Sequence, residues 1–527
     1  MSRDEYPCLN LAIDRLRSAE QENYAIWVIK APYPGGYVHH DCNWDDELMH
    51  SWIAWQEMFG SSSSQMKYPR FPAVKTDQVS PPPSTVGGTA NYSTRLMQHL
   101  GMSMWQWLFN GSIDTALAHS QGIAIGQRRP LRLRLEVRDP DLISFPWEII
   151  QPQPGKPAVS LNQEIFFSRT TSDVDQLPPQ RNDRSLRILL VLGSNEVDKH
   201  NLSLAEEAAA IAQILRNAYP SGFVPTDQMP PAGCLVDTLV QPTLNSLVSA
   251  LDNGKYNLFF YAGHGVPGAD GGILSLRSDA QLNGTELAQI LVRNQVKLAV
   301  FNSCWGAQPY QYQQQSVARS SLAEVLLHHG VPAILAMRDT IADQEAISFI
   351  QALTQSLAQR LPIDKAVATA RKQLLTLYQF NQPAWTLPVL YMHPEFDGEL
   401  IKPVTDAITE MPSFHDDLPI ACLRSLITAT QNFPIQSGLM RIGRSDENDL
   451  IIPESWVSKK HAEIIYRNSS TNEESSYFLR DFSSFGTMVQ TSQGWQKIHH
   501  QELRLKTGMN LKFGSDQGQI LEFSTQK

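Results

Sequence analysis

A histidine and a cysteine stand where a thiol nucleophile and its base would be expected to meet. His264 lies between Gly263 and Gly265, and Cys304 follows the apolar run 298–301. A thiol attacks a carbonyl as its thiolate, which a neighbouring histidine can generate. Glycines beside the histidine let a substrate approach the backbone, whose N–H groups can stabilise an oxyanion. The N–H groups of Gly265 and Cys304 are the candidate oxyanion donors.

Two short apolar runs are predicted to position these side chains. Residues 257–261 (NLFFY) and 298–301 (LAVF) are bounded by turn signals, which predicts two buried strands. Between them, residues 282–294 have apolar residues at helical spacing behind Thr285, a residue type that caps helices. A strand, a helix and a strand form a parallel crossover unit, in which both strands end at one edge of the sheet. The histidine and the cysteine are therefore expected to share a crevice, although spacing alone equally allows structural roles for both.

Composition restricts the class of protein. The 527 residues are enough for two to four domains, and 42% hydrophobic with 18% charged residues is ordinary for a globular chain. The formal net charge of −10 argues against general affinity for nucleic acid. Charges interrupt the first residues, where a signal peptide needs an apolar core, and no run approaches the roughly 18 apolar residues of a membrane span. We expect a cytoplasmic protein that binds neither nucleic acid nor membranes.

The number and the spacing of the cysteines argue against a disulfide framework and against a zinc site. They are odd in number, scattered, and never spaced as CxxC. They are Cys8, Cys42, Cys234, Cys304 and Cys422. The segment 39–42 (HHDC) is rich in metal-ligating residue types, but adjacent ligands rarely converge on one ion, so we interpret it as a surface loop. We expect no metal and no cofactor.

The first part of the chain, residues 1–180, is predicted to be an α/β subdomain. Its expected elements are a helix over 9–16, a strand over 24–31, a Trp-rich helix over 46–59, a helix over 93–117 and a strand over 131–137. Residues 60–92 are Ser- and Pro-rich and indicate a long surface loop.

The class of structure changes twice further along the chain. Residues 185–395 alternate apolar strands with amphipathic helices, which predicts an α/β layered sheet with helices on both faces. Residues 396–420 lack periodicity and are interpreted as a linker. Residues 421–527 contain short alternating strands separated by Ser, Asn and Gly turns, which predicts an all-β sandwich.

An ordered set of motifs resembles the CHAT domain, a caspase-like and separase-like branch of the clan CD cysteine peptidases. The motifs are NLFFYAGHG, GGILSL, KLAVFNSCWGA, SLAEVLLHHGVPAILAM and WTLPVLYM, and LRLRLEVRDPDLISFPWEII resembles the segment before the core of such proteins. The resemblance covers most of residues 120–395. It implies a caspase-like sheet, His264 as general base, Cys304 as nucleophile, and peptide hydrolysis through an acyl-enzyme.

The residue that would select a substrate departs from this pattern. Many relatives with basic specificity carry an acid two positions before the nucleophile, where this chain has Asn302. A P1 Arg or Lys would need a carboxylate elsewhere, and the candidate S1 acids are Asp343 and Asp339. Asp343 has an alternative interpretation as a helix N-cap.

The carboxy-terminal motifs RIGRSDENDLIIPESWVSKKHAEI and LRDFSSFGTMV resemble a forkhead-associated (FHA) domain, which reads phosphothreonine through loops at one end of a β-sandwich. A guanidinium with hydroxyl and backbone donors suits a dianionic phosphate. The resemblance makes Arg444, Ser458, Lys459 and Ser484 the phosphopeptide-binding residues and His461, Gly443 and Gly486 structural ones. The family's Asn-Gly-Thr is replaced here by Phe485-Gly486-Thr487.

Two functions remain open from the sequence. The first is a cysteine endopeptidase that its FHA domain directs to a phosphorylated protein partner or to a phosphorylated site in its own chain. The second is a catalytically silent adaptor, in which the caspase-like layer serves as an interaction scaffold and the FHA domain binds the phosphopeptide. Either function suits bacterial regulatory signalling, by resemblance.

Overall fold

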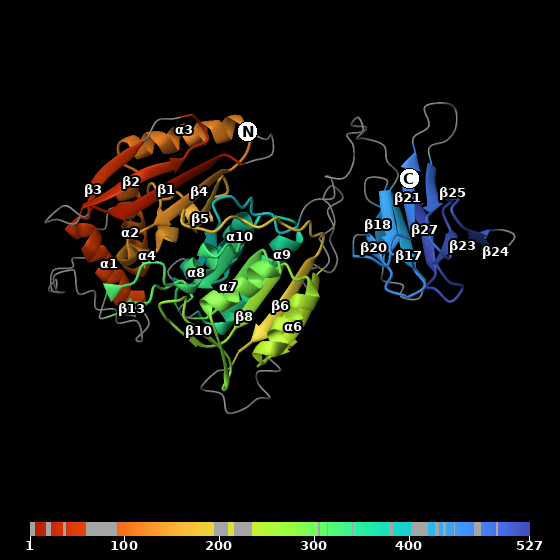
Figure 1. The fold of residues 1–527 in the computed structure, drawn as a ribbon. Coiled ribbons are helices and arrows are strands. Elements are labelled where there is room, and N and C mark those ends of the chain that lie inside the picture. The colour runs from red at the N-terminus through yellow and green to blue at the C-terminus, as the bar shows by residue number, and fades with distance from the viewer. Residues whose placement is uncertain are drawn as a thin grey trace. The chain divides into compact units, whose positions relative to one another are not determined.

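The computed structural model separates the chain into two compact units, residues 1–403 and 404–527 (Figure 1). It describes residues 6–16, 23–34, 38–59, 92–193, 209–215, 234–303, 306–312, 315–339, 341–378, 383–401, 420–426, 432–435, 439–446, 448–467, 476–491 and 494–526. The predicted loop 60–92 and linker 396–420 lie mostly outside these ranges.

An eleven-stranded sheet runs through the first unit, in the order β3-β2-β1-β4-β5-β16-β15-β12-β8-β6-β7. The strands of its amino-terminal part are β1 (Cys8–Arg15), β2 (Asn23–Lys30), β3 (His39–Asn43), β4 (Leu131–Val137) and β5 (Ile165–Thr170). The other strands are β6 (Leu186–Leu192), β7 (Cys234–Val240), β8 (Leu258–Ala262), β12 (Leu298–Asn302), β15 (Ala333–Met337) and β16 (Pro388–Met392).

Near the middle of this sheet, strand direction reverses between β15 and β16. Strands β7, β6, β8, β12 and β15 are parallel to one another, and β16 is antiparallel to β15. Strand β16 is parallel to β5, which is parallel to β4 and β1. The ladder between β5 and β16 contains a single registered pair, Arg169 with Tyr391. The two parallel groups therefore end at opposite edges of one continuous sheet.

Helices cover both faces of the part formed by β6 to β16 (Figure 1). The helices of the unit are α1 (Asp46–Phe59), α2 (Tyr92–Leu108), α3 (Ser112–Gly126), α4 (Pro140–Ile143), α6 (Leu244–Gly254), α7 (Gly284–Arg293), α8 (Leu322–His328), α9 (Asp343–Ala358) and α10 (Ile363–Tyr378). Residues 209–215 are also helical. Among the described residues, no helix is both long and apolar enough to span a bilayer.

Successive residues of the central strands lie on opposite faces of the sheet and pack into two separate cores. Phe259 and Phe301 pack with α6, α7 and α8 in one cluster, whereas Phe260 and Val300 pack with α9 and α10 in another, which includes Phe349. Each fully buried side chain of this kind stabilises the fold by roughly 1.5–3 kcal/mol. These apolar runs had to be buried on both faces, so the prediction of an α/β layered sheet with helices on both faces is confirmed.

Three predictions in the amino-terminal region are wrong. Residues 9–16 are not helical, because this segment forms β1 between β2 and β4 and buries Leu9, Leu11 and Ile13. The segment 39–42 is not a loop but lies in β3, an edge strand paired with β2. The predicted helix 93–117 is two helices, separated at Gly111, whose φ of 54° is the left-handed conformation that glycine tolerates.

Two predicted helix caps are displaced. Asn283, not Thr285, caps α7, because its side chain accepts a hydrogen bond from the N–H of Glu286 at 2.7 Å. Asp343 is the first residue of α9, and the N-cap position belongs to Ala342. Both patterns therefore located a helix correctly and assigned its N-cap to the wrong residue.

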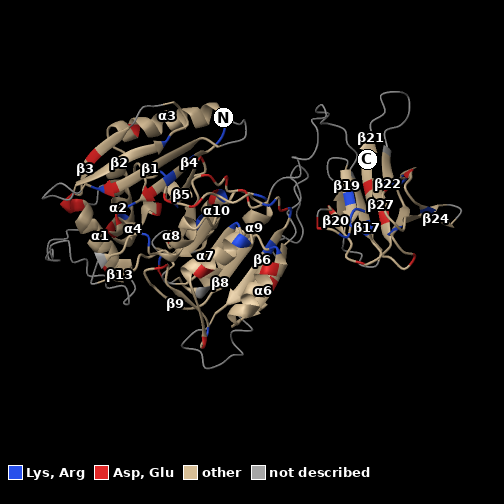
Figure 2. Cartoon of the chain, viewed as in Figure 1, with Lys and Arg blue, Asp and Glu red and all other residues tan. Residues whose placement is uncertain are grey.

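The second unit consists of two facing sheets, whose strand pairs are antiparallel except for the parallel pair β19–β20. One has the order β18-β17-β27-β26-β23-β24 and the other β20-β19-β21-β22-β25. The strands are β17 (Ile420–Ser425), β18 (Asn432–Ile435), β19 (Leu439–Gly443), β20 (Leu450–Ile451), β21 (Ala462–Arg467), β22 (Ser476–Asp481), β23 (Thr487–Thr491), β24 (Gly494–Ile498), β25 (Glu502–Arg504), β26 (Met509–Phe513) and β27 (Leu521–Gln526). Both sheets contribute to one core, for example Ile442 and Leu511, so the predicted all-β sandwich is confirmed. Acidic and basic positions are interspersed over both units (Figure 2).

Candidate functional site

His264 follows β8 at the carboxyl edge of the carboxy-terminal half of the sheet. Strands β8 and β12 are neighbours and parallel, and their last residues, Ala262 and Asn302, lie in register. His264 comes two positions after Ala262 and its side chain is exposed. Cys304, two positions after Asn302, lies outside the described residues. The strands thus bring the two segments of the predicted dyad to the same place on the sheet.

Hydrogen bonds fix the backbone of His264 while its ring remains exposed. The hydroxyl of Tyr261 lies 2.6 Å from the carbonyl oxygen of His264 and 2.9 Å from that of Ser275. The N–H of Ser275 donates to the same His264 carbonyl at 3.0 Å. Tyr261 is fully buried, and this burial raises its pKa, so its phenol keeps the proton that it donates. The histidine is therefore presented from a rigid turn.

Close backbone packing explains the glycines around this turn. A Cβ atom on Gly263 would lie 2.8 Å from the Tyr261 hydroxyl oxygen, and one on Gly193 would lie 2.3 Å from the carbonyl oxygen of Ser275. The N–H of Gly193 donates to the carbonyl of Ala262 at 2.8 Å, which extends the pairing beyond the end of β6. Side chains at either glycine would force the two loops apart.

Gly265, the second candidate oxyanion donor, is buried in the short strand β9 (Gly265–Val266). Strand β9 pairs with β10 (Ile273–Arg277), which continues through a tight connection into β11 (Ala280–Asn283). Gly265, the residue after His264, thus begins a small three-stranded sheet, and the last strand of that sheet leads into α7. Its role as an oxyanion donor remains a prediction.

The segment after the predicted nucleophile is anchored to its neighbours. The N–H of Ala307 donates to the carbonyl of Met337 at the end of β15, and the N–H of Ala323 at the start of α8 donates to the carbonyl of Gly306, both at 3.1 Å. Ser303 is 5% exposed, and its Oγ has no hydrogen-bond partner within the described residues. The described backbone on either side of Cys304 is thus held in place, by β12 before it and by these two hydrogen bonds after it.

Both candidate S1 acids follow β15 along the chain. Asp339 is half-buried and comes two positions after the end of β15, which is the neighbour of β12. The backbone of Asp343 opens α9. Asn302, the last residue of β12, is half-buried. The assignment of an S1 acid stays a prediction.

A buried ion-pair cluster near this edge was not predicted. Arg169 binds Glu148 through two hydrogen bonds of 3.0 and 2.9 Å, and Arg338, just after β15, lies 3.9 Å from the same carboxylate. Burial opposes ionisation of Glu148, but Arg169 outweighs it and lowers the pKa of that carboxyl. The sequence signal was a single charge inside each of two apolar segments, PWEII and IFFSRT. The cluster ties the amino-terminal segment to the end of β15.

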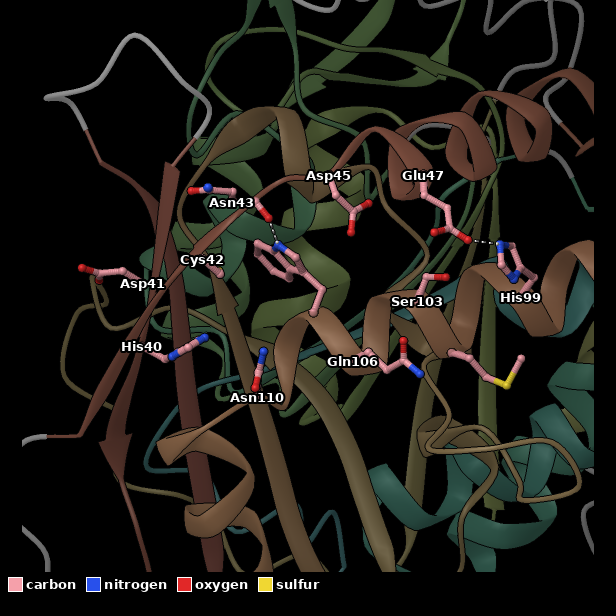
Figure 3. Close-up of a pocket in the computed structure, with 12 residues that line it drawn as sticks. His40, Asp41, Cys42, Asn43, Asp45, Glu47, His99, Ser103, Gln106 and Asn110 are labelled. Carbon is pink, nitrogen blue, oxygen red and sulfur yellow. Dashed lines mark hydrogen bonds and ion pairs between the residues drawn. The ribbon is translucent and has the colours of Figure 1, made fainter. Parts of the chain in front are cut away.

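Strand β3 lines a polar cavity of 540 Å³ together with the start of α1 and one side of α2 (Figure 3). The side chains of Glu47 and His99 face each other across it at 3.4 Å. Burial, with a smaller contribution from Asp41, raises the pKa of Cys42 to about 12. Cys42 is therefore a neutral thiol near pH 7. Among the described residues, no group of three or more His, Cys, Asp or Glu side chains is arranged to hold a metal ion.

In the second unit, three loops meet at the predicted phosphate site. The N–H of Arg444 donates to the carbonyl of Ser458 at 2.9 Å, and the N–H of Ser484 donates to Ser458 Oγ at 3.0 Å. The side chains of Arg444, Lys459 and Ser484 are exposed, and that of Ser458 is half-buried. The structure thus brings Arg444, Ser458 and Ser484 together from segments that are far apart in sequence.

The buried His461 holds two of these loops together through hydrogen bonds. Its Nδ1 accepts a hydrogen bond from the N–H of Ser458 at 3.1 Å, and its Nε2 lies 3.3 Å from the carbonyl oxygen of Gly486. This pattern requires a neutral ring with its proton on Nε2. Burial lowers the pKa of His461, partly offset by Asp481, which favours the same neutral form. His461 therefore links the Ser458 loop to the Gly486 loop.

Asn448 is a further organising residue that the sequence reasoning missed. Its side-chain amide donates to the carbonyls of Ser445 and Lys459 at 2.8 and 2.7 Å, which clamps the Arg444 loop to the Ser458 loop. Gly443 permits this approach, since a Cβ there would lie 2.4 Å from the Lys459 carbonyl oxygen. An asparagine in a turn-rich segment, SDENDL, gives little sequence signal for such a role.

Comparison with known families finds a CHAT domain over residues 98–397 and an FHA domain over residues 440–514, in the predicted order. No curated protein matches the chain. Solved FHA domains are similar to its carboxy-terminal part. That of yeast Dun1, in complex with a doubly phosphorylated peptide derived from Rad53, has 23% identity, covers 22% of this chain and 82% of its own, and gives a TM-score of 0.17. FHA-1 of Rv1747 from Mycobacterium tuberculosis has 14% identity, covers 21% of this chain and 98% of its own, and also gives 0.17.

The CHAT match spans more than half of the 527 residues and includes β8 and β12, the strands that precede His264 and Cys304. The FHA match spans the three loops around Ser458. Both resemblances inferred from the sequence motifs are thereby confirmed. The chain belongs to the CHAT domain family, and an FHA domain follows its CHAT domain.

Proposed function

We propose that this protein is a cysteine endopeptidase with a His264–Cys304 dyad, directed to its substrate by phosphothreonine binding at the FHA domain. The observation that carries the catalytic part is the register of β8 and β12, whose carboxyl ends precede the histidine and the cysteine by two residues each. The CHAT domain match supports the same assignment.

In the proposed reaction, His264 takes the proton of the Cys304 thiol, and the thiolate attacks the scissile carbonyl carbon. The protonated His264 then gives its proton to the leaving amine, and a water molecule hydrolyses the thioester. The exposed ring on a fixed backbone suits this role, because a general base must be reached by substrate while its position is held. The N–H groups of Gly265 and Cys304 would stabilise the oxyanion.

Labelling of the full-length protein by thiol-reactive peptidyl probes with different P1 residues tests the dyad. Cys304→Ala should abolish labelling, and His264→Ala should slow it about 100-fold or more, the usual contribution of a general base. Cys42→Ala is the matched control and should label like wild type, because that thiol is neutral at pH 7. Labelling that persists in Cys304→Ala would refute the assignment.

The FHA part of the proposal rests on the convergence of Arg444, Ser458 and Ser484 at one end of the sandwich. A guanidinium and a hydroxyl can donate hydrogen bonds to a phosphate dianion, and the negative charge of the dianion is attracted to an exposed arginine. Solved relatives bind such ligands, as in the FHA domain of MEK1 with a phosphothreonine peptide of HOP1. We infer a phosphothreonine-containing protein as the partner.

Fluorescence anisotropy with a phosphothreonine peptide and its unphosphorylated form tests this binding. Arg444→Ala should weaken binding about 10- to 150-fold, the loss expected for a charged hydrogen bond of 1.5–3 kcal/mol. Arg504→Ala, an exposed arginine on β25 outside the three loops, is the matched control. Equal affinity of Arg444→Ala and wild type would eliminate phosphothreonine docking at this site.

Asn302 favours a second candidate, a catalytically silent adaptor. It stands half-buried at the position where many relatives carry the acid that selects the P1 residue. An adaptor would retain phosphopeptide binding and fail to react with every P1 variant of the probe. The labelling and anisotropy experiments together therefore separate the two candidates.

A further inference from the structure

Another cavity, of 680 Å³, lies at the carboxyl ends of four strands that do not carry the proposed dyad. Strands β1, β4 and β5 lie side by side (Figure 1), and β16 follows β5 in the sheet. All four are parallel to one another. The last two residues of β1, β4 and β5 line the cavity, together with the residues directly after β4 and β5 and with Tyr391 near the end of β16. Small molecules bind to open α/β sheets outside the carboxyl ends of parallel strands, in cavities of about this size.

Four arginine side chains line this cavity, and a carboxylate holds each of them. The side chain of Arg138 is 36% exposed, whereas that of Glu136, which it binds at 3.0 Å, is 4% exposed. The side chains of Arg15 and Asp139 form a similar pair, with 22% and 5% exposed. A molecule that enters the cavity therefore meets guanidinium groups, with carboxylates behind them. The four ion pairs are Arg15 with Asp139, Arg138 with Glu136, Arg169 with Glu148 and Arg319 with Asp173.

The buried part of the cavity wall is polar as well. Arg169, Glu324 and Tyr391 are buried and line the cavity. Burial raises the pKa of Glu324, which favours its uncharged form and limits the negative charge of the wall. Asp14 is half-buried, and its carboxylate accepts the N–H of Arg15 at 2.9 Å. The wall thus combines buried polar groups with exposed guanidinium groups, which suits a charged ligand better than an apolar one.

One of the four arginines, Arg319, belongs to the chain segment that follows Cys304. Its φ of 57° is a left-handed conformation, which costs energy in a residue other than glycine and persists where the surrounding contacts enforce it. Helix α8 begins three residues after Arg319. At the start of α8, the N–H of Ala323 donates to the carbonyl of Gly306 at 3.1 Å. The contacts of Arg319 are therefore connected to the backbone two residues after Cys304.

We propose that this cavity binds a small anion that carries phosphate or carboxylate groups, and that the bound anion stabilises the segment between Arg319 and α8. A guanidinium group offers two parallel N–H donors, which match two oxygens of either anionic group. Arg138 follows an amino-terminal strand, whereas Arg319 follows the proposed nucleophile. An anion bound by both arginines therefore connects the amino-terminal strands to the segment after Cys304. The proposed site requires neither peptidase activity nor phosphothreonine binding.

Isothermal titration calorimetry tests the site, with pyrophosphate and succinate as probes at constant ionic strength. The full-length protein used here carries Arg444→Ala, which removes the arginine proposed to bind phosphate in the FHA domain. At least one probe should bind saturably to this parent protein. The further change Arg138→Ala or Arg319→Ala should weaken that binding about tenfold or more, the loss expected for a charged hydrogen bond.

Arg293→Ala is the matched control for Arg319→Ala. The side chain of Arg293, on α7, is 58% exposed and paired with Asp252, whereas that of Arg319 is 60% exposed and paired with Asp173. Both substitutions therefore remove an equally exposed ion pair, and only Arg319→Ala should weaken anion binding.

Hydrogen exchange of the same parent protein gives a second measurement. Saturation with the probe that binds should slow the exchange of peptides covering 315–326 by about threefold or more, because a ligand stabilises the structure that binds it. Exchange of peptides covering α6 should stay unchanged.

The proposed site is refuted if neither probe binds saturably to the parent protein. It is also refuted if Arg138→Ala and Arg319→Ala bind the probe as tightly as the parent, because the anion then occupies another site. Binding that leaves the exchange of 315–326 unchanged would contradict the stabilisation of that segment. Binding of pyrophosphate alone or of succinate alone supports the site and identifies the anionic group. These measurements use neither the Cys304 thiol nor a phosphothreonine peptide, so a negative result leaves the proposed function standing.

Discussion

Tyr261→Phe should loosen the turn that presents His264 without removing any residue of the proposed dyad. The phenol donates one proton, shared between the carbonyls of His264 and Ser275 at 2.6 and 2.9 Å. Loss of one neutral hydrogen bond costs about 0.5–1.5 kcal/mol, and a buried carbonyl left unsatisfied raises the cost to about 1–3 kcal/mol. The His264 carbonyl still accepts from the N–H of Ser275, so Ser275 is the group left without its partner. We expect a loss of about 2 kcal/mol in local stability.

Hydrogen exchange measured by mass spectrometry reads this loss locally. A decrease of 1–3 kcal/mol corresponds to about 5- to 150-fold faster exchange of peptides covering 262–276. Probe labelling at Cys304 should also slow, because His264 spends less time in position. Tyr256→Phe is the matched control: that phenol donates to the Asp237 carboxylate at 2.8 Å, away from the turn. It should leave exchange of 262–276 unchanged.

Unchanged exchange of 262–276 in Tyr261→Phe would refute the claim that this hydroxyl fixes the turn. Faster exchange with unchanged probe labelling would keep the structural claim and show that the position of His264 does not limit the reaction. A uniform rise in exchange over the whole of residues 1–403 would mean that the substitution destabilises the unit globally, against the local effect derived from the hydrogen bonds.

Three further outcomes are expected. Burial lowers the pKa of His461 in the folded FHA unit, so as pH falls below about 6.5 the unfolded chain takes up a proton first and the unit loses stability, by at most about 1.4 kcal/mol per pH unit in urea titrations; a flat stability between pH 7 and 5.5 would contradict this. Gly486→Ala should destabilise the same unit by more than about 1 kcal/mol, measured by thermal unfolding, because φ is 79° and the new Cβ would lie 2.8 Å from the carbonyl oxygen of Ile498. Glu148→Gln should lower the unfolding midpoint of the CHAT unit by an amount equivalent to about 3–5 kcal/mol, because Arg169 would stay buried without its counter-charge; a change below 1 kcal/mol would show that water reaches the arginine.

The sequence was sufficient where one periodicity dominated. Residues 298–301 and 186–192 are apolar throughout and became β12 and β6, since a strand covered on both faces leaves no other solution. Residues 9–16 carry a pattern that fits both a helix and a strand, and the pairing of β1 with two neighbours decided for the strand. The adjacency of β5 and β16 had no local signal, because strands paired across more than two hundred residues do not mark their partners in sequence.

For the candidate sites, motifs located the reactive residues and missed their supports. His264 and Arg444 stand in recognisable motifs, but Tyr261 and Asn448 act through hydrogen bonds to backbone carbonyls. Such bonds depend on how two loops approach each other, which spacing along one chain does not encode. The residues that hold a site are therefore harder to read from sequence than the residues that use it.

The single registered pair between β5 and β16 has a practical consequence for dissecting the protein. All five residues of β16 are buried. A fragment that begins near residue 185 would lose β5. One edge of β16 would then have unpaired backbone N–H and C=O groups among apolar side chains. Such an uncovered strand recruits strands from other chains. Soluble, monomeric material for studying His264 and Cys304 therefore calls for a fragment that ends near residue 403 and keeps the amino-terminal strands.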